Sequence, residues 1–486
     1  MNLRSTEEGP YICRSEDEDV KIALEEAFAI AGVEELTPIS KTLREFGHNR
    51  SRLIDICGER IKAMDEGEID ISVLSTTVPG IQGLVDAGQA VGLARKWNDY
   101  LAEAMAPQAG RLRGFAALPM RDPEAACAEL VRAVKELGFV GAMLNGFDNT
   151  GQGKALYYDA PEYLDFWRTA AELDVPIYLH PRVSEARLAA RYDDYPQLRG
   201  AAWGFHVETG EHLLRIMLGG VFDKVPDLRL IVGHMGEIVV YWAWRIDHRI
   251  GREGWEEWER ENGKSRNLTV TGYLRRNVFI TTSGVFDTAG LLHALDVMGA
   301  DRILYSVDYP YESTAQARDD LVAAVRALAA EFEADHPGIE VRLTGNVMLM
   351  AAFSEAAMID VMYLIPISLA VTGLVMLIFV RALLPSLAIL SLLGLSSAAA
   401  MGIVGWYGYD LNTSTVSSPV VIMTVNMAAA VRLVTTALHA LGRGISQREA
   451  IAEAISVNLW PITLTSATTI IGFLSMNLAD APPLCQ

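Results

Sequence analysis

The sequence predicts an α/β fold, a (β/α)8 TIM-like barrel, followed by an all-α segment of about four transmembrane helices. Three observations support this. Short apolar runs alternate with helical stretches up to about Asp320, which is typical of β-then-α units. Polar residues follow the carboxyl ends of several of these runs, where barrels collect their functional groups. Beyond Asp360 lysine is absent and long apolar runs take over.

The size and charge of the chain narrow its function classes. Its 486 residues are too many for one compact domain, so two or three domains are expected. The formal net charge of -20 argues against a nucleic-acid partner, because phosphate binding requires a basic face. The four cysteines lie far apart, without metal-knuckle or redox spacing. Residues 1–20 form a polar lead without the apolar run of a secretory signal peptide, so we expect none.

Eight strand-like runs can be counted in order along the first domain. They are Lys21–Leu24, Ile69–Leu74, Arg113–Leu118, Val140–Leu144, Pro176–Leu179, Leu228–Val232, Val278–Thr282 and Arg302–Ser306. Helical periodicity marks the segments between them, such as Asp122–Leu137, Pro161–Leu173, Gly210–Phe222 and Val285–Met298. A doubly wound open sheet is the alternative, but no glycine-rich phosphate loop follows the first strand. The count of eight therefore favours the barrel.

Four of the predicted strands end in residues that can bind a metal. Glu25 follows the first strand, His180 the fifth, His234 the sixth and Asp308 the eighth. Each alone could simply be a hydrogen-bonded structural residue. Together, two imidazoles and two carboxylates at one barrel mouth suit a divalent cation of intermediate hardness, such as Zn²⁺, Mn²⁺ or Fe²⁺.

Several stretches resemble one known family. They are Ala23–Ala29, Leu179–Pro181, Val207–Arg215, Gly233–Glu237, Trp244–Asp247 and Ser306–Pro310. The set resembles the amidohydrolase superfamily, and within it the metal-dependent decarboxylases of aromatic acids. The 5-carboxyvanillate decarboxylases look most similar, followed by the γ-resorcylate and 2,3-dihydroxybenzoate decarboxylases. The resemblance covers about residues 21–312, which we take as the barrel domain.

The resemblance implies one divalent metal held by Glu25, His180, His234 and Asp308. Many superfamily members have a second ligand, histidine, two residues after the glutamate, where this chain has Ala27. The 5-carboxyvanillate type resembles this chain at that position. Because fewer imidazoles make a site harder, Mn²⁺ is favoured, with Zn²⁺ as the alternative.

The resemblance also implies the reaction, non-oxidative decarboxylation of a hydroxylated aromatic acid of the carboxyvanillate and hydroxybenzoate class. Asp308 would donate the proton to the ring carbon, beside His180. Arg245, 11 residues after His234, would bind the substrate carboxylate, and Glu237 would orient that arginine or a metal ligand. A second substrate arginine would be one of three residues that the sequence does not separate, Arg44, Arg50 and Arg52.

Two other functions stay open. The same metal site could activate water to hydrolyse an ester, lactone or amide, with Asp308 as general base. Alternatively, the chain is a membrane protein, a transporter fragment whose barrel is an inactive appendage.

The second half of the chain predicts membrane insertion. Four apolar runs are long enough to cross a bilayer, namely Val361–Val380, Leu384–Trp406, Thr415–Leu438 and Trp460–Leu478. Before them, Asp319–Ala334 predicts a helix and Ile339–Leu343 a short strand. Stretches such as His336–Gly345, Ala351–Ala356, Leu411-Asn412 and Trp460–Thr469 make residues 313–484 resemble part of a resistance-nodulation-division transporter. We divide this half into a short α/β segment, residues 313–360, and a partial membrane domain, residues 361–480.

The membrane segment looks incomplete as a pump. The third span carries Arg432 but lacks the carboxylate that many such transporters use for proton coupling. Arg381 follows the first span, so the positive-inside rule places residues 313–360 outside, whereas the barrel is expected in the cytoplasm. In addition, the barrel is expected to end before its last helix. These two mismatches suggest either a chimeric or truncated reading frame or a true fusion. We expect a membrane-associated chain whose partners are a small aromatic acid and, for the barrel expressed alone, further copies in a dimer or tetramer.

Overall fold

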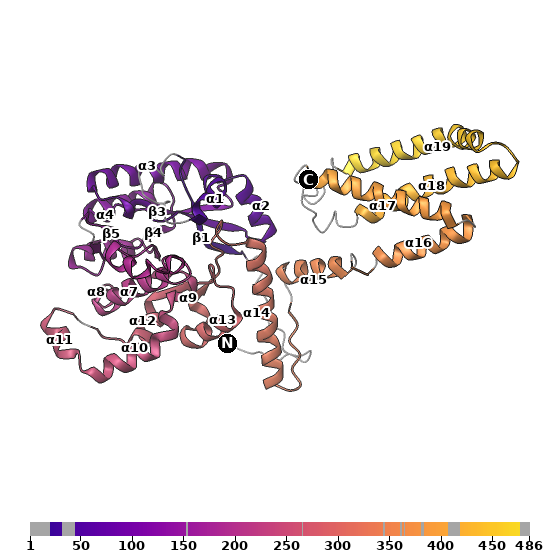
Figure 1. Ribbon diagram of the computed structural model, residues 1–486. Helices are drawn as coiled ribbons and strands as arrows, with labels where there is room; N and C mark the ends of the chain where they lie inside the picture. The colour runs from indigo at the N-terminus through magenta and orange to yellow at the C-terminus, as the bar shows by residue number, and fades with distance from the viewer. Residues whose placement is uncertain are drawn as a thin grey trace, which may run out of the picture. The chain divides into compact units, whose positions relative to one another are not determined.

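The computed structural model describes residues 20–31, 44–151, 154–264, 266–343, 346–359, 362–363, 365–380, 383–406 and 418–476. These residues form two compact units, Met1–Leu343 and Thr344–Gln486. The first unit contains the sheet and the second consists of helices (Figure 1).

The first unit is built on one sheet of eight parallel strands in the order β1-β2-β3-β4-β7-β8-β9-β10. The strands are β1 Ile22–Phe28, β2 Ile71–Thr76, β3 Leu112–Ala117, β4 Gly141–Asn145, β7 Ile177–His180, β8 Leu230–Val232, β9 Val278–Thr281 and β10 Ile303–Leu304. All eight predicted runs are thus confirmed as strands. The chain after β10 returns to β1, where Ala27 N donates to the carbonyl of Tyr309 at 2.8 Å. This contact brings the two ends of the sheet together into a nearly closed barrel.

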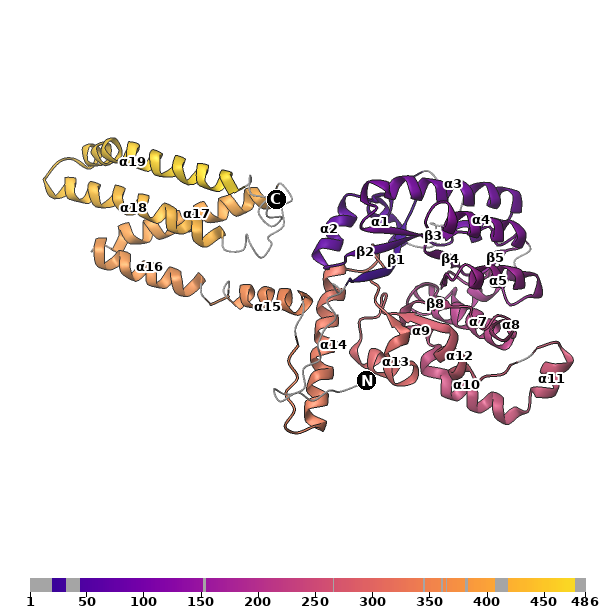
Figure 2. The same ribbon diagram turned by 180° about the vertical axis from the view of Figure 1, so that it is seen from behind.

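Helices cover the outside of the barrel (Figures 1 and 2). They are α1 Arg44–Ile54, α2 Glu59–Glu66, α3 Ala87–Met105, α4 Pro123–Lys135, α5 Leu164–Glu172, α6 Ala186–Ala189, α7 Gly204–Leu218, α8 Val221–Lys224, α10 Val239–Glu253, α11 Glu256–Glu261, α12 Val270–Asn277, α13 Thr288–Met298 and α14 Thr314–Asp335. The segment labelled α9, His234–Glu237, is a left-handed turn that follows β8. A short hairpin, β5 Asp148–Asn149 with β6 Ala155–Leu156, follows β4. Asp122, Asp287 and Ser313 begin helices α4, α13 and α14 as N-caps, each accepting a backbone N–H with its side chain.

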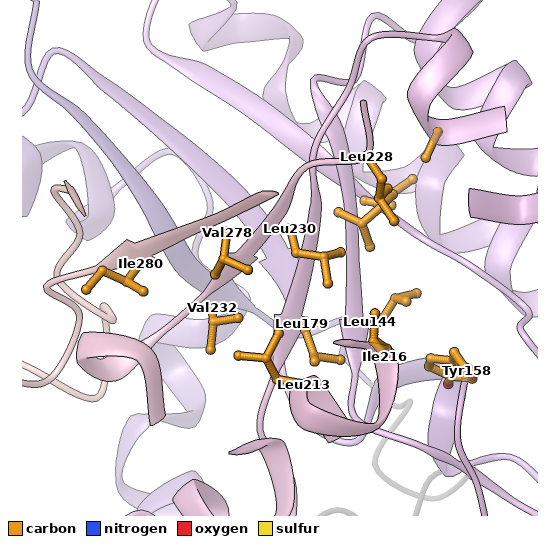
Figure 3. Packing of buried hydrophobic residues seen from close by; sticks show 14 of the residues in the cluster. Leu144, Tyr158, Leu179, Leu213, Ile216, Leu228, Leu230, Val232, Val278 and Ile280 are labelled. Atoms are coloured by element: carbon orange, nitrogen blue, oxygen red, sulfur yellow. The ribbon is translucent and has the colours of Figure 1, made fainter. Parts of the chain in front are cut away.

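Both faces of the barrel strands are buried, one against the surrounding helices and the other inside the barrel. This explains why the strand sequences are continuous apolar runs. In β8, Leu230 and Val232 face outward and pack with Leu213 and Ile216 of α7 (Figure 3). Ile231, between them, faces the barrel interior, where it clusters with Val73, Phe115, Met143 and Tyr178 of four other strands. Successive side chains of a strand point to opposite faces, so one strand serves both layers.

The barrel unit extends past the predicted boundary at Glu312. Helix α14 packs on α2 and α13, and Ala317 belongs to the same apolar core as the strands. Arg318 Nη1 also donates to the carbonyl of Glu66 at 2.8 Å. The prediction that the barrel loses its last helix is therefore wrong, because α14 covers this side of the sheet and the unit ends at Leu343. The alanine-rich sequence of α14 predicts a helix but does not indicate which elements that helix packs against.

The predicted strand Ile339–Leu343 is absent from the described chain, which is irregular there. Val341 N donates instead to Glu333 Oε1 of α14 at 2.6 Å. A side chain thus satisfies the backbone group that a strand partner would have used.

The second unit consists of helices, namely α15 Asn346–Ile359, α16 Ile365–Val380, α17 Leu383–Trp406, α18 Ser418–Gly442 and α19 Gln447–Met476. Of these, α16 to α19 each pack on the next, and α16 also packs on α18. Within the described residues, three segments are long and apolar enough to cross a membrane, namely Leu383–Trp406, Val421–Gly442 and Gln447–Gly472. The first of the four predicted spans corresponds to α16, whose 16 described residues are fewer than the roughly 20 that a bilayer requires. Arg381 and the Leu411-Asn412 motif lie outside the described residues.

Candidate active site

Glu25 lies at the centre of the site, and hydrogen bonds hold one of its two carboxylate oxygens in place. It sits inside β1, at an irregularity of register between Ala23 and Glu26, and not after the strand as predicted. Its Oε2 atom accepts hydrogen bonds from the hydroxyls of Tyr178 and Ser283. Its Oε1 atom is buried without a hydrogen-bond partner among the described residues. One oxygen is thus fixed by hydroxyls and the other is left for a ligand.

The free oxygen of Glu25 faces two imidazoles. His180 Nε2 lies 3.0 Å from Oε1 and His234 Nε2 lies 3.7 Å from it. Burial alone would raise the pKa of Glu25, but the neighbouring His234 and His180 outweigh burial and lower that pKa to about 2. The carboxylate therefore stays ionised at neutral pH.

His234 is aimed by an unusual backbone turn after β8. Residues 234–238 all have positive φ, from +49° at His234 to +63° at Ile238, and only Gly236 among them is a glycine. Such conformations cost of order 1–3 kcal/mol each for other residues and collect at functional sites. Gly233 begins the turn, and a Cβ there would lie 2.8 Å from Glu25 Oε2. The glycine is required because the turn passes so close to the carboxylate.

Glu237 ends the same turn and holds two histidines. Its buried carboxylate lies 2.7 Å from His234 Nδ1 and 2.5 Å from His206 Nδ1. A carboxylate on Nδ1 fixes the imidazole so that Nε2 points into the site, as ligating histidines require. The structure thus places Glu237 behind His234, one of the two arrangements that the sequence left open.

Asp308 enters from the segment after β10 with a φ of +78°. Its Oδ2 atom lies 3.6 Å from His234 Nε2. Burial raises the pKa of Asp308 to about 6, against the opposing effect of His234 and with the charge of Glu25 adding to the rise. Gly284 leaves room beside this pair, since a Cβ there would lie 3.2 Å from His234 Cδ2.

Three separations among the donor atoms of these residues are compatible with one divalent cation. Two ligands each about 2.1 Å from an ion stand roughly 3–3.5 Å apart, close to the separations of 3.0, 3.6 and 3.7 Å given above. Among the described residues no three such groups already stand in a metal-ligating arrangement. The ion would take the place of the direct contact between His180 and Glu25 and give Glu25 Oε1 its missing partner.

The charge on His234 is consistent with this site. Burial lowers the pKa of an imidazole, but the carboxylates of Glu25, Glu237 and Asp308 outweigh burial and raise the pKa of His234 well above its usual value. A cation at Nε2 would displace that proton, because a metal ligand must be deprotonated.

Three of the four predicted substrate arginines lie on exposed helix surfaces. Arg245 is exposed on α10, and Arg50 and Arg52 are exposed on α1, where Arg52 lies 3.8 Å from Glu59. The side chain of Arg44 lies outside the described residues. Arg245 lies on α10, which begins directly after the left-handed turn at residues 234–238.

Four residues at the site were not singled out by the sequence analysis. Tyr178, Thr281 and Ser283 surround Glu25 Oε2, and His206 of α7 shares Glu237 with His234. A signal for two of them was present, because Thr281-Thr282-Ser283 is a cluster of hydroxyls at the end of β9. Tyr178 and His206 could be found only once the strand register and the start of α7 were known.

Comparison with family models gives two matches. The amidohydrolase model matches residues 50–339, and the MMPL family model matches residues 294–486. The two matches overlap over residues 294–339, which contain α14. The barrel family thus continues through this helix, in agreement with its packing.

Known proteins similar to the first unit include several decarboxylases. The γ-resorcylate decarboxylase of Polaromonas sp. (strain JS666) is 46% identical over 307 residues, which cover 62% of this chain and 90% of that protein. A dihydroxybenzoic acid decarboxylase from Polaromonas sp. JS666, solved with manganese and the inhibitor 2-nitroresorcinol, has 43% identity and a TM-score of 0.57, covering 62% and 91% of the two chains. A 5-carboxyvanillate decarboxylase from Novosphingobium aromaticivorans, also solved with manganese, has 34% identity and a TM-score of 0.57, covering 62% and 90%. Identity is thus higher to the γ-resorcylate type than to the 5-carboxyvanillate type, the reverse of the order predicted from the sequence motifs.

Proposed function

The chain belongs to the amidohydrolase family, and we propose that its barrel is a metal-dependent carboxy-lyase that decarboxylates a hydroxylated aromatic acid. The observation that carries the proposal is the convergence of Glu25, His180, His234 and Asp308 around a buried carboxylate oxygen without a hydrogen-bond partner. The similarity to decarboxylases over nearly their whole length supports the choice of reaction.

The proposed cofactor is one divalent metal, with Mn²⁺ favoured because similar solved decarboxylases contain manganese. Glu25, His180, His234 and Asp308 would hold it. When bound, the metal supplies Lewis-acid stabilisation of negative charge on the substrate oxygens. Glu237 would keep the Nε2 atom of His234 directed at the site, and Tyr178 and Ser283 would keep Glu25 from rotating.

The proposed proton donor is Asp308. Decarboxylation needs a proton at the ring carbon that carries the carboxylate. The electron pair of the broken carbon–carbon bond then restores the aromatic ring, and CO₂ leaves. Asp308 is suited to this step because its carboxyl stands 3.6 Å from His234 Nε2, where one oxygen could bind the metal while the other carries the proton. The proton would return to Asp308 from solvent before the next turnover.

The proposed substrates carry a hydroxyl next to the carboxylate, so that both groups can approach the metal site together. We place 2,6-dihydroxybenzoate first, because the named relatives with the higher identity act on resorcylates or dihydroxybenzoates. The 5-carboxyvanillate class follows.

The second unit is proposed to anchor the chain in a membrane. It carries three helices able to cross a bilayer and matches the MMPL family. We further propose that the barrel remains in the cytoplasm and assembles with other copies of itself.

The test is an assay of the Mn²⁺-loaded full chain for CO₂ release from 2,6-dihydroxybenzoate, 5-carboxyvanillate and benzoate. We expect release from the hydroxylated acids, loss of release after chelation, and no release from benzoate, which lacks the neighbouring hydroxyl. Metal-dependent cleavage of aryl esters or amides without CO₂ release would favour the hydrolase alternative instead.

A further inference from the structure

His206 lies in the first turn of α7, a helix that packs beside the left-handed turn labelled α9 (Figures 1 and 2). The start of α7 is tightly packed, because a Cβ at Gly204 would lie 2.5 Å from the carbonyl oxygen of Arg199. His206 Nδ1 lies 2.5 Å from Glu237 Oε2, whereas His234 Nδ1 uses Oε1 of the same carboxylate. The helix and the carboxylate together fix the position of the His206 ring.

The ring of His206 borders the same opening as the proposed metal ligands. The side chains of His180, His206, His234 and Asp308 are each between 11% and 20% exposed, whereas Glu237 behind two of them is fully buried. The rings of His206 and His234 stand edge to face, with their centroids 6.0 Å apart. Because the two rings are adjacent and share Glu237, a ligand at the metal site would also meet His206.

The second ring nitrogen of His206 is open to such a ligand. Glu237 accepts the proton of Nδ1, so Nε2 of the neutral ring is a hydrogen-bond acceptor. Within the part of the chain that the structure describes, Nε2 has no hydrogen-bond partner, and it is not among the buried atoms that lack one. Solvent therefore reaches this acceptor, and a ligand can do so as well.

Other polar groups at the site are already engaged. The hydroxyls of Tyr178 and Ser283 donate to Glu25 Oε2, and the hydroxyl of Thr281 bonds to that of Ser283. The imidazoles and carboxylates of the proposed metal site are committed to the cation. His206 Nε2 differs from all of these groups, because neither a described residue nor the cation occupies it.

We propose that His206 determines substrate specificity by accepting a hydrogen bond from a second hydroxyl next to the substrate carboxylate. The proposal rests on the decarboxylase function proposed above, in which the carboxylate and one neighbouring hydroxyl approach the cation. The second hydroxyl then lies on the other side of the carboxylate. The 6.0 Å between the rings of His234 and His206 is comparable to the span between those two hydroxyls. The site would thus select 2,6-dihydroxylated aromatic acids over acids with one such hydroxyl.

A specificity role and a supporting role for His206 have different consequences. A site that hydrogen-bonds a substrate hydroxyl rejects an analogue without it, because the acceptor is left unpaired in the complex. Loss of His206 should therefore weaken binding of the dihydroxylated ligand selectively. If His206 only supported Glu237, its loss would weaken binding of Mn²⁺ and would affect both ligands equally.

The test measures binding of two unreactive analogues to the Mn²⁺-loaded full chain in detergent by calorimetry. 2-Nitroresorcinol carries a nitro group between two hydroxyls, and 2-nitrophenol lacks one of them. We expect His206→Phe and His206→Ala each to lower the ratio of the two affinities about tenfold, through weaker binding of 2-nitroresorcinol. His206→Gln should retain an intermediate ratio, because its amide oxygen can replace Nε2 as an acceptor.

The matched control is His336→Phe, at an exposed position after α14, which should leave the ratio unchanged. Titration with Mn²⁺ shows whether each variant still holds the metal. An unchanged ratio in His206→Phe and His206→Ala would overturn the proposal, and so would an equal loss of affinity for both analogues. Neither analogue can release CO₂, so this outcome is separate from turnover. Absence of CO₂ release from 2,6-dihydroxybenzoate would contradict the decarboxylase function instead.

Discussion

The two units of this chain bring residues together in different ways. In the barrel, Glu25, His180, His234 and Asp308 are far apart in the sequence and meet because parallel strands end at one edge. In the helical unit, most contacts join helices that follow one another, although α16 also contacts α18, and the side chains of Asn426 and Ser396 connect α18 to α17 at 3.2 Å. The barrel thus concentrates charge in one buried place, whereas polar groups in the helices position one helix against the next. The difference predicts that the chemistry belongs to the barrel alone.

The largest effect that could break this comparison is loss of the barrel's last helix. A chain ending at Leu343 should unfold cooperatively, because α14 still covers α2 and α13. A chain ending at Glu312 should lose cooperative unfolding altogether, because it lacks a helix that shares the core. The free energy of unfolding lost with that helix should exceed the roughly 5–15 kcal/mol by which domains are stable. Circular dichroism during heating distinguishes the two. Equal unfolding of both chains would show that α14 belongs to the helical unit and not to the barrel.

A smaller effect is expected from the residue behind His234. Glu237→Gln keeps the shape but removes the charge that faces His234 Nδ1 and His206 Nδ1. Loss of such an outer partner typically weakens metal binding about 10–100-fold. Calorimetric titration with Mn²⁺ measures this. His206→Gln is the matched control and should weaken binding less, because His234 keeps its carboxylate. Unchanged affinity in Glu237→Gln would refute the orienting role.

A substitution at Gly233 tests how closely the turn before His234 approaches Glu25. Gly233→Ala places a methyl group 2.8 Å from Glu25 Oε2, so the carboxylate or the turn must shift. We expect destabilisation of about 1–3 kcal/mol, the usual cost of overpacking, together with weaker Mn²⁺ binding. Gly92→Ala on α3, where a Cβ meets nothing within 4 Å, is the control and should be neutral or stabilising. Urea unfolding of both variants measures the difference, and equal stability would argue against the close approach.

The smallest effect concerns the helical unit. Asn458 Nδ2 donates to Thr436 Oγ1 at 3.0 Å and so joins α19 to α18. Asn458→Ala should cost about 0.6 kcal/mol, the average for such bonds between membrane helices. It should leave Mn²⁺ affinity and turnover unchanged, as measured on the full chain. A drop in turnover with this variant would show that the two units are coupled.

Much of the barrel could be predicted from the sequence because its signals are local. Each strand is a short apolar run, and His180, His234 and Asp308 come at or just after such runs, so their convergence follows from the topology. The partners of Glu25 could not be predicted in the same way. Tyr178 lies in β7 and Ser283 lies just after β9. Their approach to Glu25 depends on the register between strands and not on the spacing of residues within one strand.

The errors have a common physical cause. Helix α10 starts after five residues with positive φ. Neither Met235 nor Ile238 is a residue type that predicts this conformation, so the exposed position of Arg245 on α10 could not be predicted. Similarly, α14 reads as an alanine-rich helix with weak contrast between its faces, and only the packing assigns it to the barrel. In both cases the helix itself was predictable and its place was not.

The most direct test of a barrel-borne, metal-dependent decarboxylase is turnover of 2,6-dihydroxybenzoate by the Mn²⁺-loaded full chain and its Asp308→Asn variant. We expect metal-dependent CO₂ release from the unaltered chain. The variant should retain most of its Mn²⁺ and lose turnover by about 10²–10⁴-fold, the usual contribution of a positioned proton donor. Absence of CO₂ release from an unaltered chain that holds one Mn²⁺ would contradict the account. Turnover by Asp308→Asn equal to that of the unaltered chain would also contradict it.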